Sequence, residues 1–258
     1  MRALVVIPAR HASQRFPGKP LVELRGATGE ARSLVRRTWD AARAVEGARV
    51  VVATDDARIA EHCEGFGAEV VMTPETCRNG TERCAAALDV LGDAWDAVVN
   101  VQGDAPLTPP WFVEALLERM ADPAVAVATP VLRASPEAAA ALRADRAAGR
   151  VGATTAVMRA GAAALYFSKE VLPHSDGSAP VWHHVGVYAY RPEALRAYVG
   201  WPMGDLERAE GLEQLRFLER GVAVACVPVE ARGRPFWEVN HPADVARVEA
   251  LLAEVGLE

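Results

Sequence analysis

Apolar residues in the first hundred positions alternate between two kinds of spacing. Residues 3–7, 49–54 and 97–101 are continuous apolar runs rich in β-branched side chains, a pattern typical of buried parallel strands. Between these runs, apolar side chains recur three and four positions apart, as they do in amphipathic helices. These helices are predicted at residues 33–45, 56–66 and 81–91. The alternation predicts a parallel sheet covered by helices on both faces.

The remaining sequence continues with shorter signals of both kinds. Further strands are predicted at residues 125–131, 165–168, 185–190 and 222–229. Helical spacing predicts helices at residues 110–120, 206–219 and 242–255, and an exposed helix in the Ala/Arg-rich stretch 135–149. The sequence contains no internal repeat and no low-complexity linker. We therefore expect residues 1–258 to form a single domain.

Composition narrows the class of protein. The 258 residues are 51% hydrophobic and 24% charged, which fits a globular chain with a substantial core. The formal net charge of −6 provides no long-range attraction to nucleic acid, and we expect no nucleic-acid partner. The apolar run before Pro8 is too short for a signal peptide or a membrane span. These features predict a cytoplasmic protein without membrane contact.

The cysteines suggest neither a metal cluster nor a disulfide framework. No CxxC pair and no histidine at zinc-finger spacing accompanies them. We expect reduced, mostly buried thiols at Cys63, Cys77, Cys84 and Cys226.

A basic loop follows the first predicted strand. Residues 8–20 read PARHASQRFPGKP and bring Arg10, Arg15 and Lys19 among small residues and prolines. Cations and closely presented backbone N–H groups are what a triphosphate requires. An ordinary surface loop with solvated cations is the alternative. The loop has neither the GxGxxG pattern nor the P-loop spacing, so neither of those phosphate motifs applies.

The sequence IPARHASQRFPGKPL, at residues 7–21, resembles the opening signature of the 3-deoxy-manno-octulosonate cytidylyltransferases (CMP-KDO synthetases), within the sugar-acid cytidylyltransferases. Further matching segments follow in the same order: VVATDDARIAE, GTER at 80–83, VNVQGD at 99–104, ALYFSK at 164–169, HVGVYAYR at 184–191 and LEQLR at 212–216. The resemblance spans nearly the whole chain. It implies a three-layer α/β nucleotidyltransferase fold with a mostly parallel, Rossmann-like central sheet.

The same resemblance implies a reaction. CMP would pass from CTP to a small anionic acceptor, first of all 3-deoxy-manno-octulosonate, with release of pyrophosphate and without a protein nucleophile. The implied catalytic residues are Arg15, Lys19 and Asp104. The implied nucleotide-binding residues are Ala9, Arg10, Arg15, Lys19, Asn79, Thr81, Arg83 and Gln102. Without the resemblance, Asn79 or Thr81 would be interpreted as the start of a helix with a capping box.

Magnesium is the expected cofactor. Asp104 follows a predicted strand at the edge where α/β sheets gather ligands, and its carboxylate suits a metal held against triphosphate oxygens. A turn or helix cap is the alternative role. The family's second metal ligand is an aspartate, and Asn240 takes that position here. Its carboxamide can bind a hard cation without adding charge, or Asn240 could cap the last helix.

For the acceptor, the resemblance implies contacts from Gln102, His184, Tyr188, Glu213 and Gln214. A histidine or tyrosine on an apolar strand is, without that context, more often a satisfied core residue. The resemblance also implies a homodimer, with residues 160–191 contributing to the partner contact.

Several positions depart from the family pattern. Ala105 stands where the family has glutamate, residues 26–32 and 150–155 differ, and His183 replaces an arginine. Because these changes gather on the acceptor side, a second hypothesis keeps CTP and uses a different carboxylate or a phosphonate as acceptor. A third hypothesis, based on Ala105 and Asn240, is a non-catalytic nucleotide-binding protein. A fourth hypothesis is an NAD-dependent Rossmann dehydrogenase, which would show the same α/β alternation. This sequence lacks the glycine fingerprint of such enzymes.

Overall fold

The computed structural model describes residues 1–12, 16–150, 153–175 and 177–258. Contacts between α-carbons divide the chain into two compact units. Unit 1 comprises Met1–Glu114 and Ala231–Glu258, and unit 2 comprises Ala115–Glu230. The expectation of a single domain stays a prediction.

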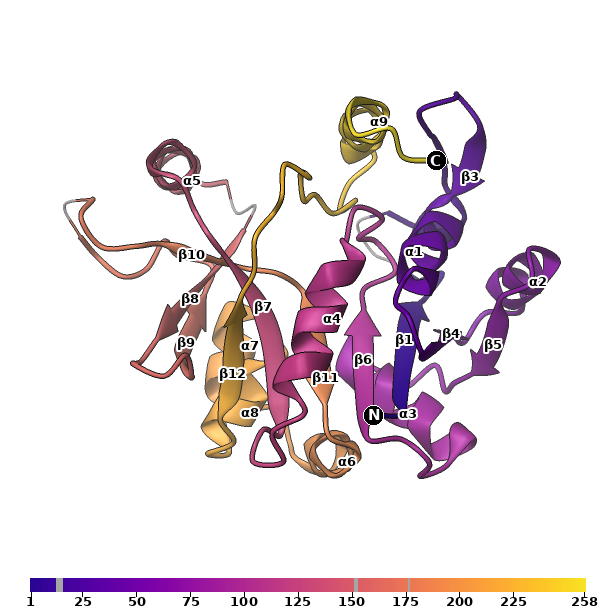
Figure 1. Cartoon of the computed structure of the whole chain (residues 1–258), viewed down its shortest axis with the longest axis horizontal. Coiled ribbons are helices and arrows are strands. Elements are labelled where there is room, and N and C mark those ends of the chain that lie inside the picture. The colour runs from indigo at the N-terminus through magenta and orange to yellow at the C-terminus, as the bar shows by residue number, and fades with distance from the viewer. Residues whose placement is uncertain (13–15, 151–152, 176) are drawn as a thin grey trace. The chain divides into compact units, whose positions relative to one another are not determined.

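Unit 1 is built around a parallel sheet (Figure 1). Its strands are β1 (Ala3–Ala9), β4 (Ala48–Thr54), β5 (Glu69–Met72) and β6 (Ala97–Val101). They lie in the order β5-β4-β1-β6, and each neighbouring pair is parallel. Three of them are the strands predicted from continuous apolar runs, and β1 and β6 are almost entirely buried. The predicted parallel core is therefore confirmed.

Three helices connect these strands: α1 (Leu34–Arg43), α2 (Ala57–Gly65) and α3 (Gly80–Leu91). Successive connections through α1 and α2 move outward from β1 to β5, whereas the connection through α3 returns to the opposite side of β1. Because such crossovers are right-handed, α3 covers the other face of the sheet from α1 and α2. Helices on both faces were expected from the alternating pattern.

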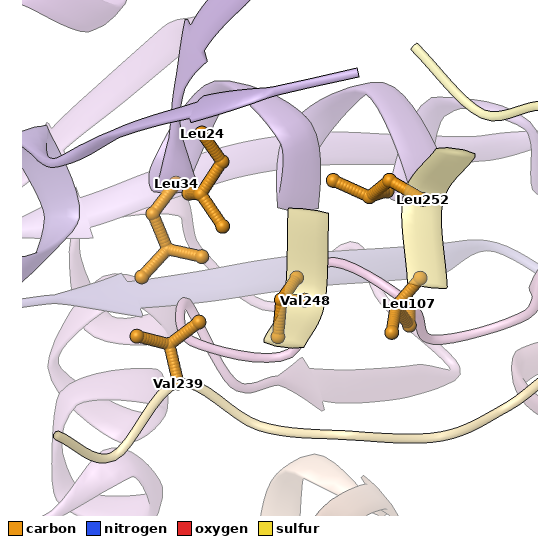
Figure 2. Packing of buried hydrophobic residues seen from close by; sticks show 6 residues of the cluster. All are labelled: Leu24, Leu34, Leu107, Val239, Val248 and Leu252. Atoms are coloured by element: carbon orange, nitrogen blue, oxygen red, sulfur yellow. The ribbon is translucent and has the colours of Figure 1, made fainter. Parts of the chain in front are cut away.

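A second apolar cluster joins the two ends of the sequence within unit 1. A hairpin of β2 (Glu23–Arg25) and β3 (Ala31–Ser33) follows the short 3₁₀ helix Lys19–Leu21, and α9 (Asp244–Glu254) lies near the end of the chain. Figure 2 shows the cluster, which is almost fully buried and consists of Leu24, Leu34, Leu107, Val239, Val248 and Leu252. We call these six residues the apolar cluster.

The carboxyl-terminal residues are also tied to this hairpin by polar contacts. The Glu258 carboxylate accepts hydrogen bonds from the backbone N–H and the hydroxyl of Thr28 at 2.9 and 2.8 Å. A β-carbon on Gly26 would lie 2.8 Å from the Glu258 α-carbon, so glycine leaves room for this approach. The hairpin was not predicted, because three-residue strands show no periodicity.

Unit 2 contains a mixed sheet. Its strands are β7 (Val127–Arg133), β8 (Thr154–Met158), β9 (Ala164–Ser168), β10 (Trp182–His184), β11 (Val187–Tyr190) and β12 (Val224–Pro228). Strand β7 pairs antiparallel with β10 and β11 and parallel with β12, and β10 continues through β8 to the edge strand β9. The helices are α5 (Pro136–Ala147), α6 (Pro192–Gly200), α7 (Asp205–Glu210) and α8 (Leu215–Glu219). Helix α4 (Pro110–Arg119) begins in unit 1 and ends in unit 2.

One helix prediction was wrong. Residues 206–219 were expected to form a single helix, but the structure has α7 and α8 with a break between them. Gly211 ends α7 in the left-handed conformation at φ 62°, which glycine adopts without steric cost at the end of a helix.

Two other expectations concern composition. The four cysteines are buried and free, as predicted. Over the described part of the chain, no helix combines the length and apolarity needed to cross a membrane.

Candidate active site

A polar pocket of about 510 Å³ opens in unit 1 at the carboxyl ends of β1 and β6. The sheet order reverses between these two strands, since β4 follows β1 on one side and β6 lies on the other. Open α/β sheets bind ligands at this kind of switch point. Seven of the predicted site residues line the pocket: Ala9, Arg10, Lys19, Asn79, Arg83, Gln102 and Asp104.

Gly103 allows the ends of β1 and β6 to approach closely. A β-carbon at this position would lie 2.7 Å from the carbonyl oxygen of Pro8. Real β-carbons do not tolerate that distance to a backbone atom, so any larger residue would push the two strand ends apart. The glycine therefore keeps the neighbouring Asp104 close to the loop that follows β1.

Lys19 and Asp104 form an ion pair in the pocket wall. Nζ of Lys19 lies 2.5 Å from Oδ2 of Asp104, and the two side chains are 15% and 22% exposed. Gly18 precedes the lysine in a left-handed conformation at φ 70°, and its N–H donates to the carbonyl of His11. The ion pair with Asp104 places the short helix that carries Lys19 beside the residues that follow β6.

The N-terminus of α3 forms another part of the pocket. Asn79 caps the helix by accepting a hydrogen bond from the Glu82 N–H at 2.9 Å. This confirms the predicted helix start. Asn79 and Gly80 also line the pocket, and the partial positive charge at a helix N-terminus favours a bound anion. Capping and ligand binding are therefore compatible at this position.

Arg83 is fixed by two neighbours rather than exposed. Its guanidinium donates to Asp55 Oδ2 at 2.7 Å and to Thr73 Oγ1 at 2.6 Å, and the residue is only 2% exposed. Asp55 follows β4 and Thr73 follows β5. The arginine thereby links the ends of two strands to α3 while still lining the pocket. Its partner Asp55 was not predicted as a site residue, because aspartate after a strand is common in turns.

Two amide side chains lie beneath the first residue of α3. A β-carbon on Gly80 would lie 2.8 Å from Nε2 of Gln102 and 2.9 Å from Nδ2 of Asn100. Asn100 is fully buried in β6, and its carboxamide has no hydrogen-bond partner among the described residues. Buried amides without partners are rare in proteins. Asn100 was not among the predicted site residues, although a polar residue inside an apolar strand is a usable signal.

Asn240 is carried by a segment attached to Asp104. The N–H of Val239 donates to the Asp104 carbonyl at 2.9 Å, so the two predicted metal ligands come from adjoining backbone. The alternative role of Asn240 as a helix cap is not supported, because α9 begins at Asp244 and its N-cap position is Ala243.

The donor set decides which kind of metal site fits. Within the ranges that the structure describes, no three His, Cys, Asp or Glu side chains group to hold a metal ion. Magnesium commonly binds through one or two carboxylates together with substrate phosphates and waters. Asp104 and Asn240 therefore fit a magnesium ion that is held jointly with a triphosphate.

Unit 2 holds the predicted acceptor residues His184 and Tyr188, on β10 and β11. Their ring centroids are 5.4 Å apart, and the Phe167 ring lies 5.0 Å from that of His184. Burial among these groups, with a smaller contribution from His183, lowers the pKa of His184 to about 3. The imidazole is therefore neutral at physiological pH, and its Nε2 is buried without a hydrogen-bond partner among the described residues.

Glu213 and Gln214 directly precede α8 in unit 2. Gln214 is 2% exposed, and its Nε2 has no hydrogen-bond partner within the described part of the chain. The carbonyl of Glu213 accepts a hydrogen bond from the Tyr198 hydroxyl at 3.2 Å. Two predicted acceptor residues, His184 and Gln214, thus have a buried donor or acceptor atom that a ligand could satisfy.

Of the predicted nucleotide and metal residues, Thr81 and Asn240 are not among those that line the pocket. Thr81 is buried at the second position of α3. Arg15 lies outside the described residues. Conversely, Cys77 lines the pocket without having been predicted, and burial raises the pKa of its thiol. This cysteine therefore contributes a neutral wall.

Comparison with known proteins identifies the family. The sequence matches the cytidylyltransferase family over residues 4–224. It is 45% identical to the 3-deoxy-manno-octulosonate cytidylyltransferase of Maricaulis maris, with 99% of each chain covered, and 40% identical to that of Myxococcus xanthus, with 99% and 98% covered.

A solved structure is similar as well. The structure of CMP:2-keto-3-deoxy-manno-octonic acid synthetase complexed with CTP has a TM-score of 0.84 and 34% identity, and the match covers 99% of this chain and 100% of that one. The predicted nucleotidyltransferase fold is confirmed by this likeness. The chain belongs to the 3-deoxy-manno-octulosonate cytidylyltransferases, a family of nucleotidyltransferase enzymes.

Proposed function

We propose that this enzyme transfers CMP from CTP to 3-deoxy-manno-octulosonate and releases pyrophosphate. The observation that carries the proposal is the polar pocket of unit 1, where Lys19, Asp104 and the N-terminus of α3 meet at the ends of β1 and β6. The relatives support the same reaction by their names, and the similar solved structure was determined with CTP.

In the proposed reaction, a hydroxyl oxygen of the acceptor attacks the α-phosphorus of CTP. A new phosphorus–oxygen bond forms, the bond to the bridging oxygen of the leaving pyrophosphate breaks, and the hydroxyl proton passes to water. Lys19 neutralises part of the phosphate charge, and the N-terminus of α3 presents backbone N–H groups to it. Arg15 stays a prediction as a further catalytic cation. Because the acceptor itself attacks, no covalent enzyme intermediate is required.

Selection of the nucleotide base falls to the amide and guanidinium groups around α3. Asn79, Gln102 and Arg83 line the pocket and offer both donors and acceptors. A site built to pair with the cytosine edge would leave groups unpaired when a different base enters, which penalises that base.

The expected cofactor is magnesium, held by Asp104 and Asn240 together with the triphosphate. When bound, the ion would neutralise phosphate charge and orient the triphosphate for in-line attack. Lys19 is already paired with the Asp104 carboxylate. A cation that binds Asp104 would therefore share this carboxylate with Lys19 or displace the lysine from it.

Binding of the acceptor is assigned to Gln102, His184, Tyr188, Glu213 and Gln214. The unpartnered buried atoms of His184 and Gln214 support this assignment, since an anionic sugar acid carries hydroxyl and carboxylate groups that can pair with them. A neutral His184 can donate from one ring nitrogen and accept at the other.

We further propose a cytoplasmic homodimer in which residues 160–191 contribute to the partner contact. Leu165 supports this, because it is 58% exposed on the edge strand β9, and an exposed apolar edge favours association. Size-exclusion chromatography with light scattering tests it, since Leu165→Lys should shift the wild-type dimer toward monomer. A wild-type protein that elutes as a monomer would contradict the proposal.

The decisive experiment measures magnesium-dependent pyrophosphate release. CTP, ATP, GTP and UTP are each offered with 3-deoxy-manno-octulosonate, other sugar acids and small phosphonates. We expect release with CTP and 3-deoxy-manno-octulosonate, and a loss of roughly 10²- to 10³-fold in Asp104→Ala. Circular dichroism and thermal melting of that variant check that its fold is retained.

The same panel tests the second candidate acceptor class. Ala105 is buried at 1% exposure beside Asp104 and brings a methyl group where the family has a carboxylate, which is the observation that favours a different acid. Turnover of a phosphonate in place of 3-deoxy-manno-octulosonate would establish that candidate. CTP binding without release from any acceptor would instead favour a non-catalytic nucleotide-binding protein.

A further inference from the structure

The segment that carries Asn240 is held at both of its ends. On one side Val239 is fully buried in the apolar cluster (Figure 2), and its N–H donates to the Asp104 carbonyl at 2.9 Å. On the other side the chain enters α9 at Asp244. Only four residues lie between Val239 and Asp244, so the backbone at Asn240 has little freedom to move away from Asp104.

The Asp244 carboxylate gathers three hydrogen bonds from this segment. Its Oδ2 accepts from the N–H groups of Asn240 at 2.9 Å and His241 at 2.7 Å, and its Oδ1 accepts from Nε1 of Trp237 at 3.2 Å. Two donors are backbone groups, so the bonds fix the path of the chain itself. The third donor is the indole ring of Trp237, three residues before Asn240 in the sequence.

The Trp237 ring is in turn held from the next turn of α9. The guanidinium of Arg247 lies over it, 3.5 Å from the ring centroid, a geometry that a cation and an aromatic face favour. On the same helix, Val248 and Leu252 pack in the apolar cluster with Val239. Asp244 therefore joins a packed helix to the segment that carries Asn240.

We propose that Asp244 is a positioning residue, which holds the Asn240 segment against Asp104 and thereby sets how tightly the enzyme holds the divalent cation of the CTP complex. This inference rests on the proposed function, because it assumes that Asp104 and Asn240 meet the metal triphosphate. Asp244 itself uses both carboxylate oxygens on N–H donors, so its role is to orient the segment rather than to bind the ion.

The chemistry distinguishes aspartate from its isostere at this position. Both oxygens of a carboxylate accept hydrogen bonds, whereas an asparagine would replace one of them with an NH₂ donor. That donor would face either Trp237 Nε1 or the two backbone N–H groups. Asp244→Asn therefore preserves the size of the side chain but breaks at least one contact. Substitution of a residue that positions a metal ligand commonly lowers metal affinity by roughly 10- to 100-fold.

The experiment measures Mn²⁺ binding to the full-length protein by electron paramagnetic resonance, with CTP present and acceptor absent. We expect Asp244→Asn to weaken Mn²⁺ binding by roughly tenfold, within the range for outer-shell partners. Asn240→Ala should have a similar effect, and the double variant should be no weaker than the single ones. Glu254→Gln, which changes an exposed acid on the same helix, serves as the matched control.

A second variant covers the case in which Asp244→Asn fails to melt cooperatively. Trp237→Phe removes the Nε1 donor and leaves a smaller aromatic ring for Arg247 to contact, and we expect it to weaken Mn²⁺ binding about twofold or more. Unchanged Mn²⁺ binding in both variants would overturn the inference, as would equal losses from Asp244→Asn with and without the Asn240 carboxamide. Pyrophosphate release by the wild type is measured in parallel, so that failure of the proposed function itself is recognised separately.

Discussion

One ion pair of unit 1 and one ion pair of unit 2 differ clearly in their exposure to solvent. In unit 1, Lys19 and Asp104 are 15% and 22% exposed and lie in the pocket wall. In unit 2, Arg216 and Glu207 are 0% and 4% exposed. Two hydrogen bonds of 2.6 Å join the latter pair, and the Arg216 guanidinium also lies 4.0 Å from the Tyr198 ring centroid.

The difference separates a binding group from a structural one. A buried ion pair repays the loss of hydration only when its hydrogen bonds are complete, and it then has no capacity left for a ligand. Arg216 and Glu207 meet that description and support the LEQLR segment that carries Glu213 and Gln214. Lys19 and Asp104 remain reachable, so each can exchange its partner for a phosphate or a cation.

The largest expected effect is the loss of stability when the buried ion pair of unit 2 is broken. Glu207→Ala would leave the Arg216 charge buried without a counter-charge, and we expect the free energy of unfolding to fall by about 3–5 kcal/mol. Urea denaturation measures it. Glu69→Ala breaks an exposed pair with Arg49 and should cost less than about 1 kcal/mol. Equal losses in the two variants would remove the distinction that we draw.

Lys19→Met tests the pocket side. The variant keeps the length of the stem but loses the charge, so kcat/KM with CTP should fall roughly 10- to 100-fold, as expected for a charge-assisted contact of about 1.5–3 kcal/mol. The melting temperature should stay close to that of the wild type, because Asp104 remains partly solvated. A large drop in melting temperature with unchanged kinetics would make this pair structural, like that of unit 2.

Gly103→Ala tests whether the strand ends must approach closely for the pocket to exist. The added methyl group would overlap with the Pro8 carbonyl. Overpacking of this kind typically lowers the free energy of unfolding by about 1–3 kcal/mol. We expect weaker CTP binding by calorimetry together with lower stability. Gly65→Ala, where nothing lies within 4 Å of the added carbon, is the control and should leave CTP binding unchanged.

The smallest expected effect concerns buried His184. Burial lowers its pKa in the folded protein to about 3, so below the ordinary value near 6.5 the unfolded chain binds a proton that the folded chain does not. Stability from this group is therefore complete above about pH 6.5 and declines by roughly 1.4 kcal/mol per pH unit as the pH falls. His184→Gln should flatten the dependence of unfolding free energy on pH between 7 and 5.

The exposed His174 provides a matched control for this measurement. His174→Gln should leave the slope as it is in the wild type. If the slope is the same in all three proteins, then His184 is protonated or solvated in the folded state, and its assignment as a neutral acceptor group is wrong.

The sequence predicted the core of unit 1 better than it predicted the short elements of both units. Strands β1, β4 and β6 were predicted because buried parallel strands are continuous apolar runs, a signal that needs no tertiary information. The hairpin of β2 and β3, and the three-residue strand β10, are too short to show any period. Helix α7 ends at Gly211 within an otherwise helical pattern, and one residue of unusual backbone conformation decided that boundary.

The residues of the candidate site also divide into those that the sequence predicted and those that it did not. Pocket residues such as Lys19 and Asp104 could be predicted because their motifs resemble a family pattern, and the structure brings them together. Asp55 could not, since its contact runs to a residue that local sequence does not identify. Asn100 carried a signal that was not used, a polar side chain inside an apolar strand. Asp244 has local contacts, but an aspartate at the start of a helix is common and does not point to a site. Asp55 meets Arg83 across 28 positions, and only the folded chain joins them.

The division of unit 1 between two separate stretches of sequence has a consequence for protein synthesis. Unit 2 is one uninterrupted stretch of sequence, whereas unit 1 is completed only by Ala231–Glu258. A ribosome adds roughly 5–20 residues per second and delivers the chain from its N-terminus, so unit 2 is fully translated before the last segment of unit 1. We therefore expect a nascent chain to acquire protease resistance in unit 2 first, while the nucleotide pocket awaits the segment that carries Val239 and Asn240.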